Sequence, residues 1–320
     1  MRSETYSAVI PSFNRRETLV RVVGALQRQD SPGLLEEVIV VDDGGSDGAA
    51  EAVEERRWEL PVRVVRQQRA GPAAARNAGA SQVRGDIVLF LCDDIEAEPC
   101  LVRLHDERRA DVRGPHCVVG RVEWPPSAAV TPFMRFVDAN YHFGWSRCAG
   151  AEELRFHGFV TANLSVHREL LLRVGGFDPA FPYGFEDTDL GLRLVHETGM
   201  RILYAPDALA WHHHTVNVPG YCRRQEALGP SAIAFAAKHP DHPQVTRLER
   251  LPTWHTLGGA LKRLARNPIT RPLWCAAVSL GFRFGATRLG ELAGHQLLAY
   301  HYYRGIERAL RAAGRPGHHT

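Results

Sequence analysis

The first ninety residues alternate short apolar runs with amphipathic stretches. The apolar runs are rich in β-branched residues and predict strands. They are Ser7–Ile10, Glu37–Val41, Val62–Val65 and Asp86–Leu91. The amphipathic stretches predict helices. These are Glu17–Gln29, Asp47–Trp58 and Pro72–Val83. Strands that alternate with helices form a mostly parallel sheet with helices on both faces, so we expect an α/β fold of the doubly wound type.

The middle of the chain is less regular. Residues 112–160 hold eight aromatic side chains, several prolines and no clean period, which fits either irregular core packing or an aromatic flap over a binding site. From residue 158 onward the pattern of strands and helices returns. It predicts strands at Ala162–His167, Arg201–Tyr204 and Ala208–His212, and helices at Arg168–Val174 and Glu186–Glu197.

The last part of the chain, residues 251–320, is expected to be a helical extension. Apolar residues recur there at helical spacing from Leu289 to Leu310, with Arg304, Arg308 and Arg311 beside them. Packing of this stripe within the protein is one interpretation, and docking on anionic lipid is the alternative. The apolar run Leu273–Phe282 is shorter than the roughly 20 residues that a membrane span needs.

Composition narrows the function classes. The chain has 320 residues, 44% of them hydrophobic, and a net charge of +3. Residues 257–320 carry ten basic and two acidic side chains, a net of +8, so residues 1–256 carry −5. The basic character is therefore local, and it does not indicate nucleic-acid binding.

The cysteines and the N-terminus bear on the compartment. The six cysteines include no C-x-x-C pair, which argues against a zinc site and a disulfide framework. The N-terminal residues lack a long apolar stretch and a cleavage-site pattern, so we expect no signal peptide and a cytoplasmic protein.

Polar and glycine-rich loops follow each of the first four predicted strands. Their sequences are Pro11-Ser-Phe-Asn-Arg15, Asp42-Asp-Gly-Gly-Ser-Asp-Gly48, Gly71-Pro-Ala-Ala-Ala-Arg-Asn-Ala-Gly79 and Cys92-Asp-Asp94. The carboxyl ends of parallel strands meet at one sheet edge, which is where such folds bind ligands. Any one loop could be an ordinary turn or helix start, but together they predict a ligand site.

Two acidic clusters supply candidate chemistry. Asp93 and Asp94 end a buried strand and could hold a divalent cation, because hard cations prefer oxygen ligands. Glu186 and Asp187 open a helix and could supply a general base. Acids in a first helical turn can also merely complement the helix dipole.

Taken in order, these motifs resemble those of family 2 glycosyltransferases of the GT-A fold. The resemblance covers roughly residues 6–214. It rests on Val9-Ile-Pro-Ser-Phe-Asn-Arg15, Val40-Val-Asp-Asp-Gly-Gly-Ser-Asp-Gly48, Ala74-Ala-Arg-Asn-Ala-Gly79, Leu89-Phe-Leu-Cys-Asp-Asp94, Gly175-Gly-Phe-Asp178 and Glu186-Asp-Thr-Asp-Leu190. It implies a nucleotide-diphosphate sugar donor, a Mg²⁺ or Mn²⁺ ion and hexosyl transfer to an acceptor hydroxyl with inversion.

The resemblance also implies roles for individual residues. Asp94 and His212 would hold the metal, and Asp187, or else Glu186, would be the general base. Arg76 would approach the diphosphate. The remaining nucleotide-sugar-binding residues would be Pro11, Phe13, Asn14, Arg15, Asp42, Asp43 and Asp93.

The chain departs from the family pattern at one metal-site position. The family motif D-x-D falls on Cys92-Asp93-Asp94, and a thiol is a poor ligand for a hard cation. The His212-His213-His214 triplet leaves open which imidazole faces the metal. A carboxylate pair that reads a pyrimidine edge favours UDP as the nucleotide, with dTDP as the alternative.

Within this frame, residues 1–115 are expected to be the nucleotide-sugar-binding half of one domain. Residues 116–250 would be its acceptor-binding and catalytic half, and residues 251–320 a basic amphipathic extension with possible peripheral membrane contact. The acceptor is open: a small molecule, a glycan or a lipid-linked molecule. The competing hypothesis is a non-catalytic nucleotide-sugar binding or scaffold protein. A dinucleotide oxidoreductase is disfavoured because no G-x-G-x-x-G follows the first strand.

Overall fold

The computed structural model describes residues 4–141, 144–148, 150–242, 267, 269–284 and 287–313. The chain divides into two compact units. The sheet unit comprises Met1–Ala128, Phe143–Pro182 and Glu186–His214, and the helical unit comprises Ala129–His142, Tyr183–Phe185 and Thr215–Thr320.

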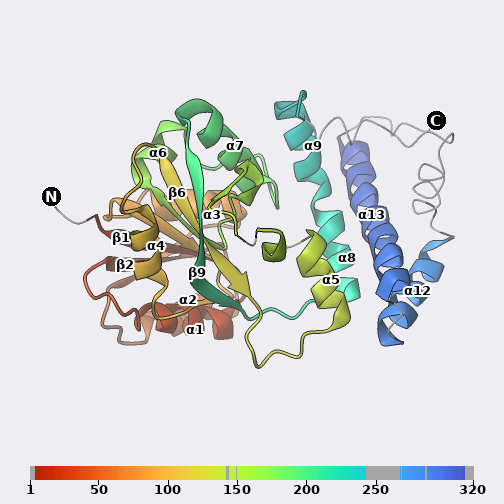
Figure 1. Ribbon diagram of the computed structural model, residues 1–320, viewed down its shortest axis with the longest axis horizontal. Helices are drawn as coiled ribbons and strands as arrows, with labels where there is room; N and C mark the ends of the chain where they lie inside the picture. The colour runs from red at the N-terminus through yellow and green to blue at the C-terminus, as the bar shows by residue number, and fades with distance from the viewer. Residues whose placement is uncertain are drawn as a thin grey trace. The chain divides into compact units, whose positions relative to one another are not determined.

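A mixed nine-stranded sheet forms the core of the sheet unit, with the strand order β3-β2-β1-β4-β8-β6-β9-β5 and β7 paired to β9 (Figure 1). The strands are β1 (Tyr6–Ser12), β2 (Leu35–Asp42), β3 (Val62–Arg66), β4 (Ile87–Leu91), β5 (Ile95–Ala97), β6 (His116–Glu123), β7 (Glu153–Leu154), β8 (Asn163–His167) and β9 (Arg201–His212). The first four are mutually parallel, so their carboxyl ends meet at one edge. β8 runs antiparallel to β4 and β6.

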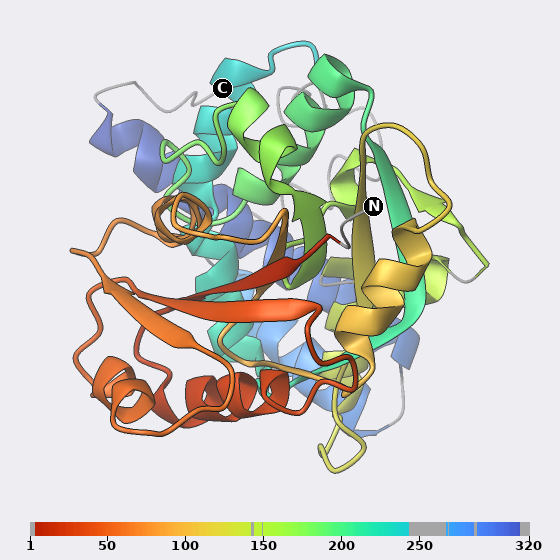
Figure 2. The same ribbon diagram turned by 90° about the vertical axis from the view of Figure 1, so that its left-hand side faces the viewer.

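Helices cover both faces of this sheet. The sheet unit contains α1 (Arg16–Leu26), α2 (Ala49–Glu54), α3 (Pro72–Ala80), α4 (Leu101–Arg109), α6 (Arg168–Arg173) and α7 (Glu186–Thr198). Figure 2 shows α1 and α2 on one face of the β1–β3 strands and α3 on the other. The predicted α/β architecture of the doubly wound type is confirmed.

Differences from the predicted elements have local causes. The two strands expected at 201–204 and 208–212 form the single strand β9. The helix expected to reach Trp58 ends at Glu54, because the Trp58 indole turns back and its Nε1 donates to the Val53 carbonyl at 2.8 Å. The irregular 112–160 segment contains β6 in the sheet unit and α5 (Pro132–Tyr141) in the helical unit.

The small residues of α3 serve packing. A Cβ on Gly79 would stand 2.4 Å from Cγ1 of Val9 on β1, so only glycine lets the helix lie this close to the sheet. Gly71, at the N-cap of α3, has φ +91°, which disfavours other residues. The small side chains of α3 therefore let it pack closely against β1.

The helical unit is built around α13 (Thr287–Ala312), which packs on α8 (Val218–Ala227), α9 (Gly229–Lys238) and α12 (Arg271–Arg283). Gly229 and Gly305 let two backbones cross closely, since a Cβ on Gly229 would lie 2.2 Å from the Gly305 carbonyl carbon. The predicted C-terminal helices are thus present, while residues 251–266 of the predicted extension lie outside the described residues.

Candidate active site

The first acidic pair occupies the turn between β4 and β5. The Ile95 amide donates to the Cys92 carbonyl at 3.1 Å, which closes the turn. The Phe13 amide, from the loop after β1, donates to Oδ2 of Asp93 at 3.3 Å. Burial and the charge of Asp94 raise the pKa of Asp93 to about 7. Two adjacent carboxyls are therefore held at the sheet edge by neighbouring strand ends.

Asp94 is surrounded by basic side chains. Its Oδ2 lies 3.5 Å from His212 Nε2 and 3.9 Å from an Arg15 Nη atom. Burial opposes ionisation, but His212, Arg15 and His214 together lower the pKa of Asp94 to about 2. Asp94 is therefore a carboxylate at neutral pH, which is the form that binds cations.

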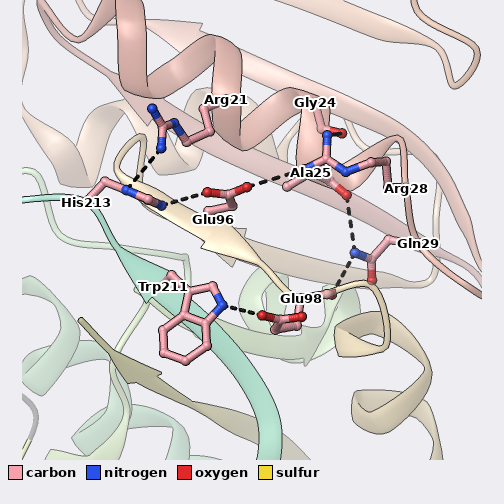
Figure 3. Close-up of polar contacts among 9 residues, drawn as sticks. All are labelled: Arg21, Gly24, Ala25, Arg28, Gln29, Glu96, Glu98, Trp211 and His213. Carbon is pink, nitrogen blue, oxygen red and sulfur yellow. Dashed lines mark hydrogen bonds and ion pairs between the residues drawn. The ribbon is translucent and has the colours of Figure 1, made fainter. Parts of the chain in front are cut away.

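The three histidines at the end of β9, His212 to His214, point in alternate directions, as side chains on extended backbone do. His212 faces Asp94, and Nδ1 of His214 lies 3.3 Å from the Arg15 guanidinium. His213 turns the other way, toward Glu96 and Arg21 (Figure 3). Of the triplet, His212 is thus the imidazole nearest Asp94.

Asp94 and His212 provide one carboxylate oxygen and one imidazole nitrogen, a donor set that suits Mn²⁺ or Mg²⁺. Within the described part of the chain, no group of three or more His, Cys, Asp or Glu side chains is placed to hold a metal ion. A cation bound through one or two protein ligands takes its remaining ligands from water and substrate phosphates. The pair fits a cation that is shared with a diphosphate, and not a structural metal.

The second acidic pair surrounds a buried arginine. Arg76 of α3 lies 3.0 Å from Glu186 and 3.8 Å from Asp187, with its side chain 7% exposed. Asp187 also accepts hydrogen bonds from the Thr161 amide at 3.0 Å and its hydroxyl at 2.9 Å. Burial and the charge of Asp187 raise the pKa of Glu186, while Arg76 opposes the rise.

The exposed fractions distinguish the two acids. The Asp187 side chain is 23% exposed and that of Glu186 only 8%. A group that removes a proton from an acceptor must reach it, so Asp187 is the better placed of the two. Arg76 lies against the acids, and its predicted contact with a diphosphate stays a prediction.

Cys92 links the two clusters. Burial raises the pKa of its thiol to about 12; Arg76 acts in the opposite direction, and Asp94, Asp93 and Asp187 add to the rise. Charges from both clusters thus act on one side chain. Without a metal ion the thiol is therefore protonated at neutral pH.

The carboxylates at the end of β2 stabilise the loops around them through hydrogen bonds. Asp43 accepts hydrogen bonds from Gln67 Nε2 at 2.7 Å and from the Ala70 and Gly71 amides at 2.7 and 2.9 Å. Asp42 accepts from the Gly45 amide at 2.8 Å. Both carboxylates support loops in this structure, and their contact with a base stays a prediction.

The loop after β1 is the last of the four loops at the carboxyl edge of the sheet. Pro11 lies in β1 opposite Val41. Asn14 adopts φ +54°, and its Oδ1 accepts from the Ser46 amide at 2.7 Å, which joins the first two loops. The Arg69 guanidinium lies 4.1 Å from the centre of the half-buried Phe13 ring.

Two residues near the site were missed by the sequence analysis. Thr161 holds Asp187, and Trp124 of the β6–α5 connection stacks on His212 with ring centres 6.2 Å apart. Trp124 Nε1 also donates to the His214 carbonyl at 3.0 Å. Neither residue belongs to a motif, and both lie far from their partners in the sequence, so no local signal identifies them.

Comparisons with known proteins were made on sequence and on structure. The family model "Glycosyl transferase family 2" matches residues 7–172. A validoxylamine A glucosyltransferase of Streptomyces hygroscopicus subsp. limoneus is 30% identical over 270 residues, covering 73% of this chain and 56% of the relative. A pre-mycofactocin glycosyltransferase of Mycobacterium tuberculosis (strain CDC 1551 / Oshkosh) is 32% identical over 294 residues, covering 85% of this chain and 59% of the relative. The chain thus spans less than two thirds of the length of these relatives.

Solved structures share the fold. The mannosyltransferase PcManGT from Pyrobaculum calidifontis, in complex with GDP-Man and Mn²⁺, aligns with a TM-score of 0.62 at 19% identity, covering 95% of this chain and 88% of that one. S. aureus TarS 1–349 in complex with UDP aligns with a TM-score of 0.53 at 14% identity, covering 94% of this chain and 92% of that one. The shared fold, the family match over more than half of the chain and the curated relatives agree: this chain belongs to glycosyl transferase family 2.

Proposed function

We propose that the protein is a metal-dependent, inverting glycosyltransferase that moves a hexose from a nucleotide-diphosphate sugar to an acceptor hydroxyl. One observation carries the proposal: Asp94 lies 3.5 Å from His212, and the partly exposed Asp187 is close enough for its charge to act, like that of Asp94, on Cys92. A candidate cation site and a candidate base therefore lie at the same sheet edge. The family membership and the relatives, which are glycosyltransferases by name, support it.

In this proposal each cluster has one task. Asp94 and His212 would hold Mn²⁺ or Mg²⁺, which when bound stabilises the negative charge of a leaving diphosphate. Asp187 takes the proton from the acceptor hydroxyl, and Thr161 fixes the orientation of its carboxylate. Arg76 places a positive charge beside Glu186 and Asp187, and it opposes the rise that burial causes in the pKa of Glu186.

UDP is the favoured nucleotide, with dTDP as the alternative. The TarS complex with UDP supports a uridine nucleotide, whereas PcManGT was solved with GDP-Man, so a guanosine nucleotide is a necessary comparison. Phe13 offers a half-buried aromatic face at this edge for a base.

The test is a calorimetric titration of UDP, dTDP, GDP and ADP with and without Mn²⁺. We expect one nucleotide to bind with an affinity that depends on Mn²⁺, and Asp94→Ala to remove that dependence. Asp30→Ala is the matched control, because Asp30 is an exposed acid paired with Arg103. Binding that ignores Mn²⁺ would refute the metal role. Metal-dependent binding without release of UDP from UDP-sugars would instead favour the non-catalytic nucleotide-sugar binding protein.

The acceptor is proposed to lie at an anionic membrane surface. Six large apolar side chains of the described helical unit are at least half exposed, on α12, on the first turns of α13 and next to them: Ile269, Leu273, Leu280, Phe284, Leu289 and Leu292. Leu273, Leu280 and Phe284 are spaced i, i+7 and i+11 and so share one helix face. The helix α12 carries two arginines and no acid.

This combination of exposed apolar residues and arginine suits the interface of an anionic bilayer. Among the described residues, no helix is both long and apolar enough to cross a membrane. Residues 257–266 of the basic segment lie outside the described residues. The proposal therefore rests on α12 and the start of α13.

Cosedimentation with phosphatidylglycerol vesicles tests this surface. The triple variant Leu273→Gln/Leu280→Gln/Phe284→Gln should lose binding, while Leu172→Gln, an equally exposed leucine of the sheet unit, should keep it. Equal binding of the triple variant and the wild-type protein would refute the proposal. A dimer that the triple variant disrupts, without vesicle binding by the wild-type protein, would instead show contact between two copies.

A further inference from the structure

Asp94 and His212 are brought together by the pairing of two strands. The short strand β5 begins directly after Asp94 and runs antiparallel to the end of β9, with Ile95 opposite His212. The His213 amide donates to the Asp94 carbonyl at 2.8 Å, one further bond of the same ladder. The distance between the two candidate ligands therefore depends on this pairing.

The pairing has little backbone support of its own. The strand β5 has three residues and lies at the end of the strand order, so only β9 pairs with it. A short edge strand has few ladder hydrogen bonds and no second neighbour. The end of β9 also pairs with β6 as far as Trp211, which lies opposite Glu123. β5 is therefore the less supported of the two strands, and contacts beyond its few backbone hydrogen bonds add to what holds it against β9.

Side chains supply that support on the face opposite His212. His213 Nε2 lies 2.6 Å from Oε2 of Glu96, and the two side chains are 17% and 22% exposed. Arg28, just after α1, pairs with the other Glu96 oxygen at 3.3 Å, and a nitrogen of Arg21 on α1 lies 3.4 Å from His213 Nδ1 (Figure 3). Trp211 on β9 also donates to Glu98, the residue after β5.

We propose that Glu96 and His213 form a clamp that positions His212 against Asp94 for the bound cation. The proposal rests on the proposed function, because it presumes that Asp94 and His212 hold a cation. Since side chains alternate along β9, fixing His213 on one face fixes His212 on the other. Glu96 and His213 are positioning residues: neither faces the cation side of β9.

The test is a titration of Mn²⁺ followed by electron paramagnetic resonance, in the presence of UDP and without turnover. Glu96→Ala and His213→Ala should each weaken Mn²⁺ binding by about tenfold, as loss of a group that orients a metal ligand does. The double variant should be no weaker than the weaker single variant, because each residue acts through the other. Arg28→Ala, which removes only a 61% exposed partner of Glu96, should change the affinity by at most about twofold.

The outcomes separate this inference from the proposed function. If the wild-type protein binds no Mn²⁺, the metal role and the clamp both fail. If the wild-type protein binds Mn²⁺ and Glu96→Ala binds it equally well, the clamp alone fails. Additive losses in the double variant would also overturn it. If Glu96→Ala does not fold, Glu96→Gln keeps the side-chain shape, and the same comparison is made with an expected loss of at least about threefold.

Discussion

The two acidic pairs of the sheet unit are neutralised in different ways. Asp94 is balanced by His212 and by Arg15, whose side chain is 37% exposed and stands 3.9 Å away. Glu186 and Asp187 are balanced by Arg76, which is 7% exposed and in direct contact with Glu186. The first pair thus has a loosely held positive partner, and the second has a permanent internal cation.

This difference separates two kinds of chemistry. A carboxylate with a loosely held partner can exchange that partner for an external cation. A carboxylate beside a buried arginine already has an internal positive partner and does not need a metal ion to balance it. Under the proposed function, this difference suits the first pair to cation binding and the second to proton transfer.

The largest effect is expected at Asp187. Asp187→Asn keeps the shape and the contact with Thr161 but cannot accept a proton, so release of UDP from UDP-glucose or UDP-N-acetylglucosamine should fall by about 10²–10⁴-fold. Calorimetry should show unchanged Mn²⁺–UDP affinity. Glu186→Gln is the matched control and should keep turnover within about tenfold of wild type. A larger loss of turnover in Glu186→Gln than in Asp187→Asn would indicate that Glu186 is the base.

The second effect concerns stability. Arg76→Met should lower the free energy of unfolding by about 3–5 kcal/mol at pH 8, because the buried Glu186 and its partly exposed neighbour Asp187 lose their counterion. Urea unfolding measures this. Arg66→Met is the control, since Arg66 also pairs with two glutamates, Glu51 and Glu54, but at an exposed position. Its expected cost is at most about 1 kcal/mol. Equal losses would show that burial of Arg76 is unimportant.

A third prediction uses the opposite pKa shifts of two buried glutamates. The pKa of Glu186 is raised by burial and by Asp187, so its ionisation destabilises the fold as pH rises. The stability of Glu186→Gln relative to wild type should therefore increase between about pH 4 and pH 8. Burial opposes the change at Glu37, but bonds from the Arg84 amide, Arg63 and Ser7 lower its pKa. For Glu37→Gln the relative stability should accordingly decrease as pH rises through the acid range, up to about pH 5, and then level off. Parallel trends in urea unfolding would contradict the assignment.

The smallest effect is expected at Arg15. Arg15→Gln should change the free energy of unfolding by less than about 1 kcal/mol, because its pairing with Asp94 is long and partly solvated. The affinity of the Arg15→Gln variant for Mn²⁺ in the absence of nucleotide should not be weaker than that of the wild-type protein, because Arg15 competes with the cation for Asp94. A stability loss as large as that of Arg76→Met would remove the contrast between the two pairs.

Much of the sheet unit could be predicted from the sequence. β1 to β4, β8, α6 and α7 follow local periodicity, which is a property of neighbouring residues. The segments α4, β6 and α5 were not predicted. α4 has few apolar positions, and the aromatic residues of 124–145 are divided between two units, so no single period describes them.

The candidate site was predicted in part. Motif order indicated Asp94, Asp187 and His212 as residues of interest. It did not show that Arg76 lies between Glu186 and Asp187, or that Asp43 supports the loop before α3. These contacts join residues that are distant in the chain, and residue types alone do not specify which partner a buried charge meets.

The sequence by itself determined the succession of strands and helices, the acidic pairs at their ends and the family, because these depend on short-range patterns. Only the tertiary structure decided which histidine faces Asp94 and which acid is exposed. The pairing of β5 with β9 turns His212 toward Asp94 and His213 toward Glu96. The approach of α3 to α7 buries Glu186 against Arg76 and leaves Asp187 reachable. Both results depend on which distant segments pack together, and that is set by the whole core and not by any local pattern.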